Sequence, residues 1–233
     1  MVITVSRQAE CDGEEVISLV AERTGLRVAD RAILERIAQR EGLPIAHLAL
    51  FDEVVPGPIE SLIAEWQTSV SHALYVRRLA STLLLLERED DVLIIGRGAA
   101  FVLTDPGTLH VRIAAPMPCR VARLMARQET SASAAERILR RSDEVRARFI
   151  RQAFRADIDS PLHYDLTINT AELPFQDAAD VIVLAAQRKS ARRAAPAQVT
   201  EGFSSRMLHF RRRPRLPRVS EIIWERCQKG THR

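Results

Sequence analysis

Residues 2–20 read VITVSRQAECDGEEVISLV and join a short apolar run to a segment of helical period. Val2 to Val5 has the continuous, β-branched character of a buried strand. From about Glu14 to Arg23 the apolar residues recur at helical spacing, and Gly25 follows where a helix commonly ends. A strand, a loop and a helix in this order form the place where an α/β sheet can bind phosphate with backbone N–H groups.

In the rest of the first 187 residues, short apolar runs alternate with longer segments of helical period. This pattern predicts a parallel sheet flanked by helices. We expect three further strands, at Val92–Ile95, Leu109–Ala114 and Asp165–Asn169. We expect further helices from about Asp30 to Gly42, then at Ile59–Glu87, Cys119–Arg127 and Phe175–Gln187.

The composition fits one compact core, because 233 residues with 46% hydrophobic content are too few for two full domains. The N-terminus has no basic targeting region, and the longest leucine cluster is far too short to cross a bilayer, so we expect a cytoplasmic protein. The three cysteines are widely spaced and form no C-x-x-C pair, which predicts free thiols. The motifs H-E-x-x-H, G-x-S-x-G and G-x-G-x-x-G are absent, and the histidines show no metal-ligand spacing.

Charge divides the chain into two parts. Residues 188–233 carry 13 Lys and Arg against 3 Asp and Glu, whereas the remainder is acidic. We therefore expect a folded domain at residues 1–188 and a basic, largely disordered tail at 189–233, with a short helix near 219–228. Such a tail would attract nucleic acid or an acidic protein surface, including this protein's own body.

Four stretches, taken in order, resemble the cytidylate kinase-like family, relatives of the P-loop nucleoside monophosphate kinases. They are ITVSRQ (residues 3–8), Asp30 after a short hydrophobic segment, IGRGA (residues 95–99) and YDLTINT (residues 164–170). The resemblance covers roughly residues 2–187. It implies a P-loop NTPase-like three-layer α/β fold, in which helices and an arginine-rich helical lid flank a parallel sheet. The implied activity is a transferase reaction, the phosphorylation of CMP or a related nucleoside monophosphate by ATP with Mg²⁺.

The phosphate-binding loop departs from the family pattern. Where the family usually has Gly-Ser-Gly-Gly after an aromatic residue, this chain reads ECDGEE over residues 10–15, so only Gly13 remains and four carboxylates line the loop. Two like charges ~4 Å apart repel by ~4 kcal/mol at an effective dielectric of ~20, and ATP is strongly anionic. Asp12 and Glu15 have the spacing of a capping box, which predicts that they occupy the helix end that phosphate needs.

The sequence also lacks the P-loop lysine, since no lysine precedes Lys189. The resemblance makes Ser6, Arg7, Gln8 and Gly13 the phosphate-loop residues, with Arg7 the nearest replacement for the lysine. Further candidate catalytic arginines fall where related kinases carry a mobile lid: Arg137, Arg140, Arg141 and Arg146. The alternative is that these arginines, with Glu136, Asp143 and Glu144, form a solvated, salt-bridged helix face.

The acceptor side keeps more of the family pattern. Arg97 would sit at the carboxyl end of a central strand and pair with the phosphate of a nucleoside monophosphate, unless it is simply an exposed turn residue. Asp30 would contact the base or sugar, or merely cap its helix. Asp157 and Asp159 are candidates to help hold Mg²⁺ or are solvated loop carboxylates, and we predict no dedicated protein metal site.

Two classes of function follow from these features. One is a nucleoside monophosphate kinase that uses ATP and Mg²⁺. The other is a kinase-like scaffold, a pseudokinase that binds nucleotide weakly or not at all and acts through partners or its basic tail. The altered phosphate loop favours the second class, whereas the acceptor turn and the arginine-rich segment favour the first.

Overall fold

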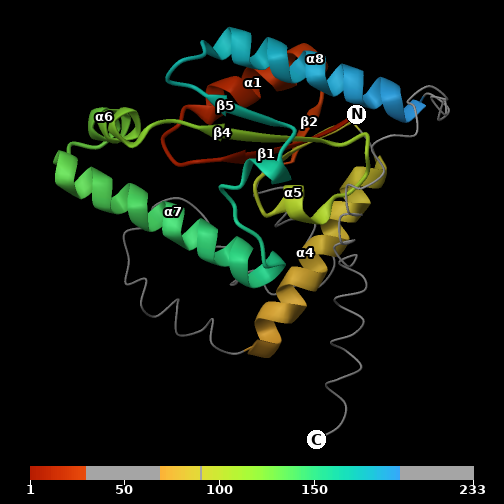
Figure 1. Cartoon of the computed structure of the whole chain (residues 1–233), viewed down its shortest axis with the longest axis horizontal. Helices are drawn as coiled ribbons and strands as arrows, with labels where there is room; N and C mark the ends of the chain where they lie inside the picture. The colour runs from red at the N-terminus through yellow and green to blue at the C-terminus, as the bar shows by residue number, and fades with distance from the viewer. Residues whose placement is uncertain (30–68, 90, 195–233) are drawn as a thin grey trace, which may run out of the picture. The chain divides into compact units, whose positions relative to one another are not determined.

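The protein, a computed structural model, is built on a five-stranded parallel sheet (Figure 1). The structure describes residues 1–29, 69–89 and 91–194. The strands are β1 (Val2–Arg7), β2 (Arg27–Ala29), β3 (Val92–Ile95), β4 (Leu109–Ala114) and β5 (Leu166–Asn169). Their order is β2-β3-β1-β4-β5, so β1 lies at the centre and the chain winds outward to both sides.

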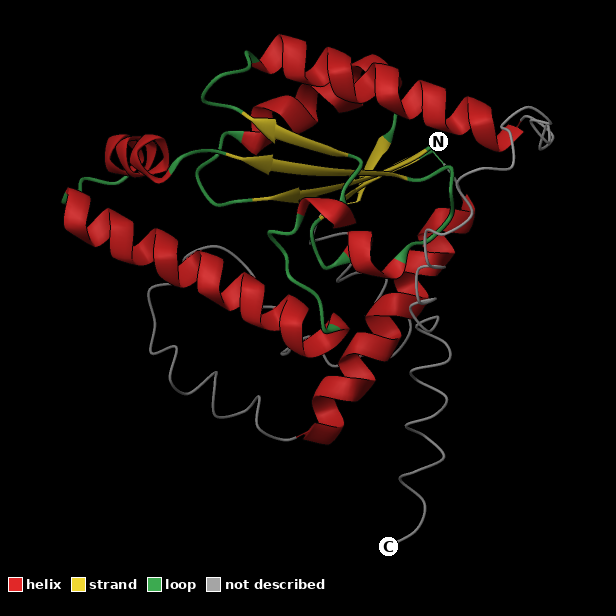
Figure 2. Cartoon of the chain, in the orientation of Figure 1, coloured by secondary structure: helices red, strands yellow, loops and turns green. Residues whose placement is uncertain are grey.

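Helices cover both faces of the sheet, which gives three layers (Figures 1 and 2). The helices are α1 (Gly13–Thr24), α4 (Ser69–Glu89), α5 (Ala99–Val102), α6 (Met117–Arg127), α7 (Ala132–Phe154), η3 (Pro161–His163) and α8 (Phe175–Ala194). One core cluster joins the sheet to α1 and α8, and a second joins the other face to α4, α5 and the end of α7. Ile3 and Leu93 are fully buried in the first cluster, and Leu83 and Ile94 in the second.

The predicted fold class is confirmed, and the predicted strands match β1, β3, β4 and β5 closely. The short strand β2 was missed, because three residues are too few to show a period. Helix α8 continues to Ala194, beyond the predicted end at Gln187. The predicted helices at 30–42 and 219–228, and the first part of the one at 59–87, lie outside the described residues. Among the described helices, none combines the length and apolar character needed to cross a membrane.

The turn after β3 is tightly packed. Gly96, Arg97 and Gly98 all adopt left-handed backbone conformations, with φ of 67°, 56° and 69°. The Gly96 N–H donates to the Val5 carbonyl at 2.8 Å, which fixes the turn against the end of β1. A Cβ on Gly98 would lie 2.4 Å from Cε2 of Phe154 on α7, so glycine is required there for two reasons.

Replacing Gly98 tests this packing. Gly98→Ala should destabilise the fold by about 2–5 kcal/mol, because the left-handed backbone costs about 1–2 kcal/mol and overpacking adds about 1–3 kcal/mol. Urea denaturation measures the change. The matched control is Gly25→Ala, since Gly25 has φ 68° but nothing within 4 Å of its added Cβ. Equal losses in the two variants would show that the contact with Phe154 does not constrain the turn.

Candidate phosphate-loop and acceptor site

The loop between β1 and α1 keeps a backbone suited to glycine. Glu10 and Asp12 both adopt left-handed conformations, with φ of 55° and 52°. Such a conformation costs a non-glycine residue of order 1 kcal/mol, somewhat less for Asp. Asp12 occupies the N-cap position of α1 but its side chain makes no capping hydrogen bond. The predicted capping box of Asp12 and Glu15 is therefore wrong, and no side-chain cap covers the first turn of α1.

The loop carboxylates are instead paired with arginines. Arg7 Nη2 lies 2.7 Å from Glu14 Oε1, and Arg123 Nε lies 2.5 Å from Asp12 Oδ2. A third guanidinium serves several carboxylates, since Arg127 lies 3.5 Å from Glu10, 3.8 Å from Asp12 and 3.9 Å from Glu15. The side chains of Asp12 and Arg123 are only 15% and 22% exposed, so water screens this pair less than a surface pair. These arginines offset the repulsion among the four carboxylates.

Helix α6 carries Arg123 and Arg127, which pair with the loop, and a further arginine, Arg120, which holds the helix against the loop and α7. Arg120, Arg123 and Arg127 follow one another at spacings of three and four residues, so they share a helix face. Arg120 is buried, donates to the Ala9 carbonyl at 3.4 Å and binds both oxygens of Asp143 on α7 at 3.1 and 2.8 Å. A small apolar cluster of Ala9, Leu124, Ala135 and Leu139 packs the same three segments together. The loop, α6 and α7 are thus joined by packing and by a buried ion pair.

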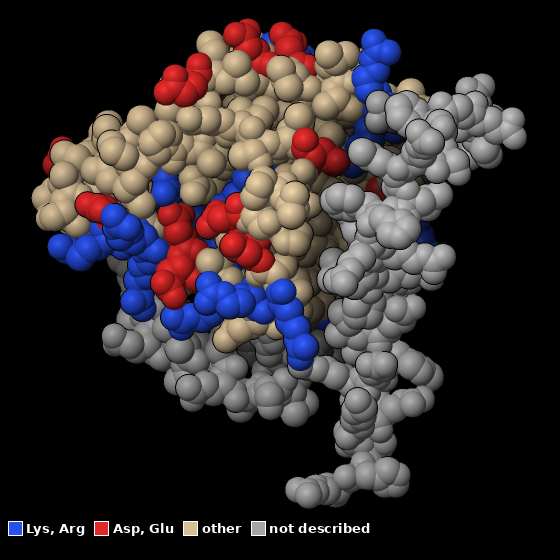
Figure 3. All heavy atoms as spheres, viewed as in Figure 1, with Lys and Arg blue, Asp and Glu red and all other residues tan. Residues whose placement is uncertain are grey.

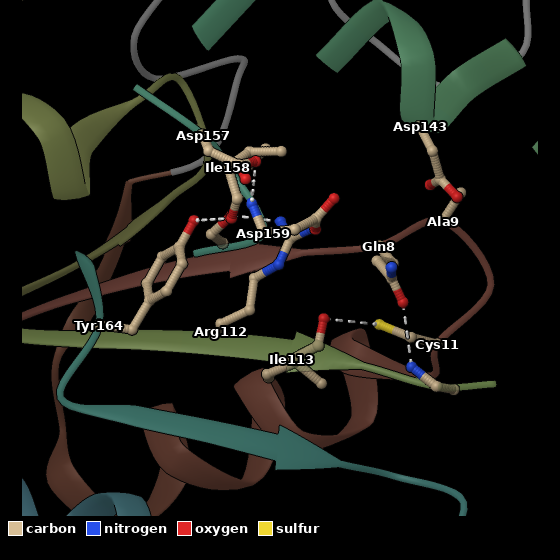
Figure 4. Close-up of polar contacts among 12 residues, drawn as sticks. Gln8, Ala9, Cys11, Arg112, Ile113, Asp143, Asp157, Ile158, Asp159 and Tyr164 are labelled. Carbon is tan, nitrogen blue, oxygen red and sulfur yellow. Dashed lines mark hydrogen bonds and ion pairs between the residues drawn. The ribbon is translucent and has the colours of Figure 1, made fainter. Parts of the chain in front are cut away.

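The predicted loop residues Ser6 and Gln8 connect the loop to β4. Gln8 accepts from the Ala115 N–H at 3.2 Å and donates its own N–H to the Ile113 carbonyl at 3.1 Å (Figure 4). Ser6 Oγ accepts from Arg112 Nη1 at 2.8 Å. Ser6, Arg7, Gln8 and Gly13 therefore lie together, as predicted for one loop, but Ser6 and Gln8 already have protein partners.

Cys11 and Gly13 form the inner part of the loop. The Cys11 thiol is buried, lies 3.7 Å from the Ile113 carbonyl, and has its pKa raised by burial, so it is neutral at physiological pH. Gly13 is also buried, and a Cβ there would lie 3.2 Å from Cys11 Sγ and 3.1 Å from Arg7 Cδ. The thiol or the arginine stem would have to shift by a few tenths of an ångström to admit a larger residue at Gly13.

Arg112 is a second buried arginine, on β4 beside the loop. Its Nη2 donates to Asp159 Oδ1 at 2.7 Å, and its guanidinium lies 6.0 Å from the ring centroid of Tyr164 (Figure 4). The Tyr164 hydroxyl donates to the Ile158 carbonyl at 2.8 Å, and burial raises the pKa of this phenol. Arg112 therefore links the end of β1 to the loop that precedes β5.

The candidate magnesium carboxylates lie on this same loop. Asp159 pairs with Arg112, and Asp157 accepts the Asp159 N–H at 3.0 Å. Across residues 1–29, 69–89 and 91–194, no group of three or more His, Cys, Asp or Glu side chains is arranged to hold a metal ion. Mg²⁺ is commonly held by one or two carboxylates together with substrate phosphates. Asp157 and Asp159 have the carboxylate oxygens that this kind of binding uses.

The acceptor candidate Arg97 lies next to the phosphate loop in space. It follows β3, whose Ile95 pairs with Val5 of β1, so the turn and the loop leave the same edge of the sheet. Asp30, the other acceptor candidate, lies outside the described residues. The carboxyl edge of the central strands thus carries the phosphate loop, the arginine turn and the Arg112 cluster together.

The candidate lid arginines lie on α7, a helix of 23 residues capped by Ser131. Arg140 binds Glu136 at 2.6 Å and Arg148 binds Glu144 at 3.3 Å, which are the i,i+4 pairs of a salt-bridged face. Arg137 and Arg141 are exposed, and Arg146 is half-buried. Figure 3 shows many basic side chains along this part of the surface, with acidic ones among them. The described contacts favour the salt-bridged alternative for Arg140.

Sequence reasoning missed Arg112, Arg120, Arg123 and Arg127 as site residues. The helix containing the last three was predicted, and their same-face spacing was a usable signal. Arg112 was harder to find, because an arginine inside an apolar strand gives no indication of the partner that compensates its burial.

Comparison with known proteins identifies one family. The profile of the "Cytidylate kinase-like family" matches residues 2–172. A cytidylate kinase from Haloquadratum walsbyi is 31% identical over 99 residues, which are 42% of this chain and 51% of that protein. A uronate isomerase from Corynebacterium glutamicum is 31% identical over 101 residues, which are 43% of this chain and 20% of that protein. The chain spans about half or less of the length of these curated relatives.

A solved structure agrees with the fold. An uncharacterized protein from Eubacterium ventriosum superposes with a TM-score of 0.58 at 18% identity, and the match covers 80% of this chain and 98% of that chain. At this identity the likeness concerns the fold alone. The family profile matches well over half of the chain, in the region that forms the sheet and its phosphate edge, and the protein therefore belongs to the cytidylate kinase-like family.

Proposed function

We propose that the protein binds nucleoside phosphates at the carboxyl edge of its sheet and transfers a phosphoryl group from ATP to CMP or a related nucleoside monophosphate. The observation that carries this proposal is the β1–α1 loop. It retains the left-handed backbone at Glu10 and Asp12, and α1 begins without a side-chain cap. Backbone N–H groups and the positive end of a helix are what a phosphate needs.

In this proposal the chain's own residues supply positioning and charge. Arg7, on the loop, neutralises donor phosphates in place of the missing lysine, and it must first exchange its partner Glu14. Arg97 binds the phosphate of the acceptor, and Asp30 contacts its base or sugar. Arg137, Arg140, Arg141 and Arg146 would neutralise the transferring group if α7 closes over the site. ATP would bring Mg²⁺ with its phosphates, and that ion would neutralise charge between donor and acceptor.

A second function, a kinase-like scaffold without turnover, is favoured by a different observation. The arginines nearest to the loop are already paired with the protein's own carboxylates, and the sequence offers no lysine to the donor phosphates. Such a protein would still bind a monophosphate at the acceptor turn.

Calorimetry separates these two functions. We expect a titration of Mg-ATP into the protein with CMP present to give sustained heat, because turnover continues after binding. A saturating heat without turnover would support the scaffold. Absence of both signals from the folded protein would contradict nucleotide binding altogether.

Arg97 tests the acceptor half of the proposal. Arg97→Ala should weaken CMP binding at least about tenfold, since a charge-assisted pair with phosphate is lost. Isothermal titration with CMP alone measures this without any need for turnover. The matched control is Arg88→Ala, which removes the same charge from an exposed position in the last turn of α4, near the amino end of β3. CMP affinity that falls equally in both variants would remove Arg97 from the site.

A further inference from the structure

The phosphate loop carries its own anions at the place where a nucleotide's phosphates would bind. Four carboxylates stand in and next to the loop, at residues 10, 12, 14 and 15, and three guanidinium groups pair with them, from residues 7, 123 and 127. These side chains together therefore carry no excess positive charge. Arg120 adds none, because Asp143 binds it through both oxygens.

Two of these carboxylates occupy positions that the backbone reserves for glycine. Glu10 and Asp12 hold left-handed conformations that their side chains disfavour. Both carboxylates are largely buried, at 17% and 15% exposed, and both turn toward arginines of α6. The loop therefore keeps a phosphate-compatible backbone while its side chains hold the arginines.

We infer that Glu10 and Asp12 determine the charge selectivity of the phosphate loop. They hold Arg123 and Arg127, so each phosphate added to a nucleotide gains no unpaired cation. The loop then binds the mono-, di- and triphosphate of one nucleoside with similar affinity. This inference rests on the proposed nucleotide binding at this loop, and it concerns the class of ligand that the loop accepts.

The inference depends on the short distance between the Asp12 carboxylate and the Arg123 guanidinium. Asp12 and Arg123 are in direct contact and largely shielded from water, so salt in solution screens them little. A terminal phosphate that approaches Arg123 must displace Asp12 or accept repulsion from it. Removing the Asp12 charge removes the anionic partner of this guanidinium, which still donates to the Glu10 and Thr170 carbonyls at 3.4 and 3.5 Å. The resulting gain in affinity grows with the charge of the ligand.

The test compares AMP, ADP and ATP in isothermal titrations without Mg²⁺ at one ionic strength, with the full chain. For the unchanged protein we expect the three dissociation constants to agree within about threefold. Asp12→Asn should strengthen ATP binding at least about tenfold and AMP binding less than about threefold. Asn tolerates the left-handed backbone, so this variant keeps the loop conformation.

Two further variants complete the test. Glu10→Gly should shift the affinities in the same direction, and it also relieves backbone strain if Asp12→Asn folds poorly. Asp180→Asn is the matched control, because it removes one ion-paired carboxylate, the partner of Arg23 at 2.8 Å, from α8. This control should leave all three affinities unchanged, and the basic tail contributes equally to every variant.

The outcomes are distinct. The inference would be overturned if the unchanged protein bound ATP more than about tenfold tighter than AMP. It would also be overturned if all three affinities rose equally in Asp12→Asn. Either result would still support nucleotide binding. Binding by Asp12→Asn alone, in the order of ligand charge, would uphold the inference and contradict ATP use by the natural protein. No binding by Asp12→Asn and Glu10→Gly in folded form would overturn both.

Discussion

The ion pairs between the phosphate loop and α6 are the interaction on which the candidate site depends. Without Arg123 and Arg127, the largely buried Asp12 carboxylate would lose its ion-pair partners, which is strongly unfavourable. The same pairs determine where α6 lies, and Arg120 extends the connection through Asp143 to α7. The ion pairs that compensate the loop carboxylates therefore also connect the loop to α6 and α7.

In the β1–α1 loop, the backbone conformation and the side-chain charges have different consequences for phosphate binding. Glu10 and Asp12 hold left-handed backbone conformations, and the Asp12 side chain does not cap α1. The side chains set the electrostatics of the loop, since Arg7, Arg123 and Arg127 each have a carboxylate partner. Under the proposed nucleotide binding, phosphate would exchange for these carboxylates, and this would link nucleotide affinity to the charges at residues 10 and 12.

The sequence predicted the layers of the fold because its signals are local. A continuous apolar run indicated β3, and the alternation of short apolar runs with helical segments indicated a parallel sheet. The family-like stretches, taken in order, predicted a phosphate loop after β1. The capping box failed because local spacing between Asp12 and Glu15 competes with an arginine more than a hundred residues away. Burial of Arg112 likewise depends on Ser6 and Asp159, which come from distant segments. Such long-range ion pairs leave no periodic trace in the sequence.

A double-mutant cycle on Asp12 and Arg123 tests the central claim most directly. The free energies of unfolding of the natural protein, Asp12→Asn, Arg123→Gln and the double variant give the coupling between the two side chains. A direct, largely buried ion pair predicts a coupling of about 1 kcal/mol or more. Additive changes, with a coupling below about 0.3 kcal/mol, would contradict the account, because the loop carboxylates would not then be held by the arginines of α6.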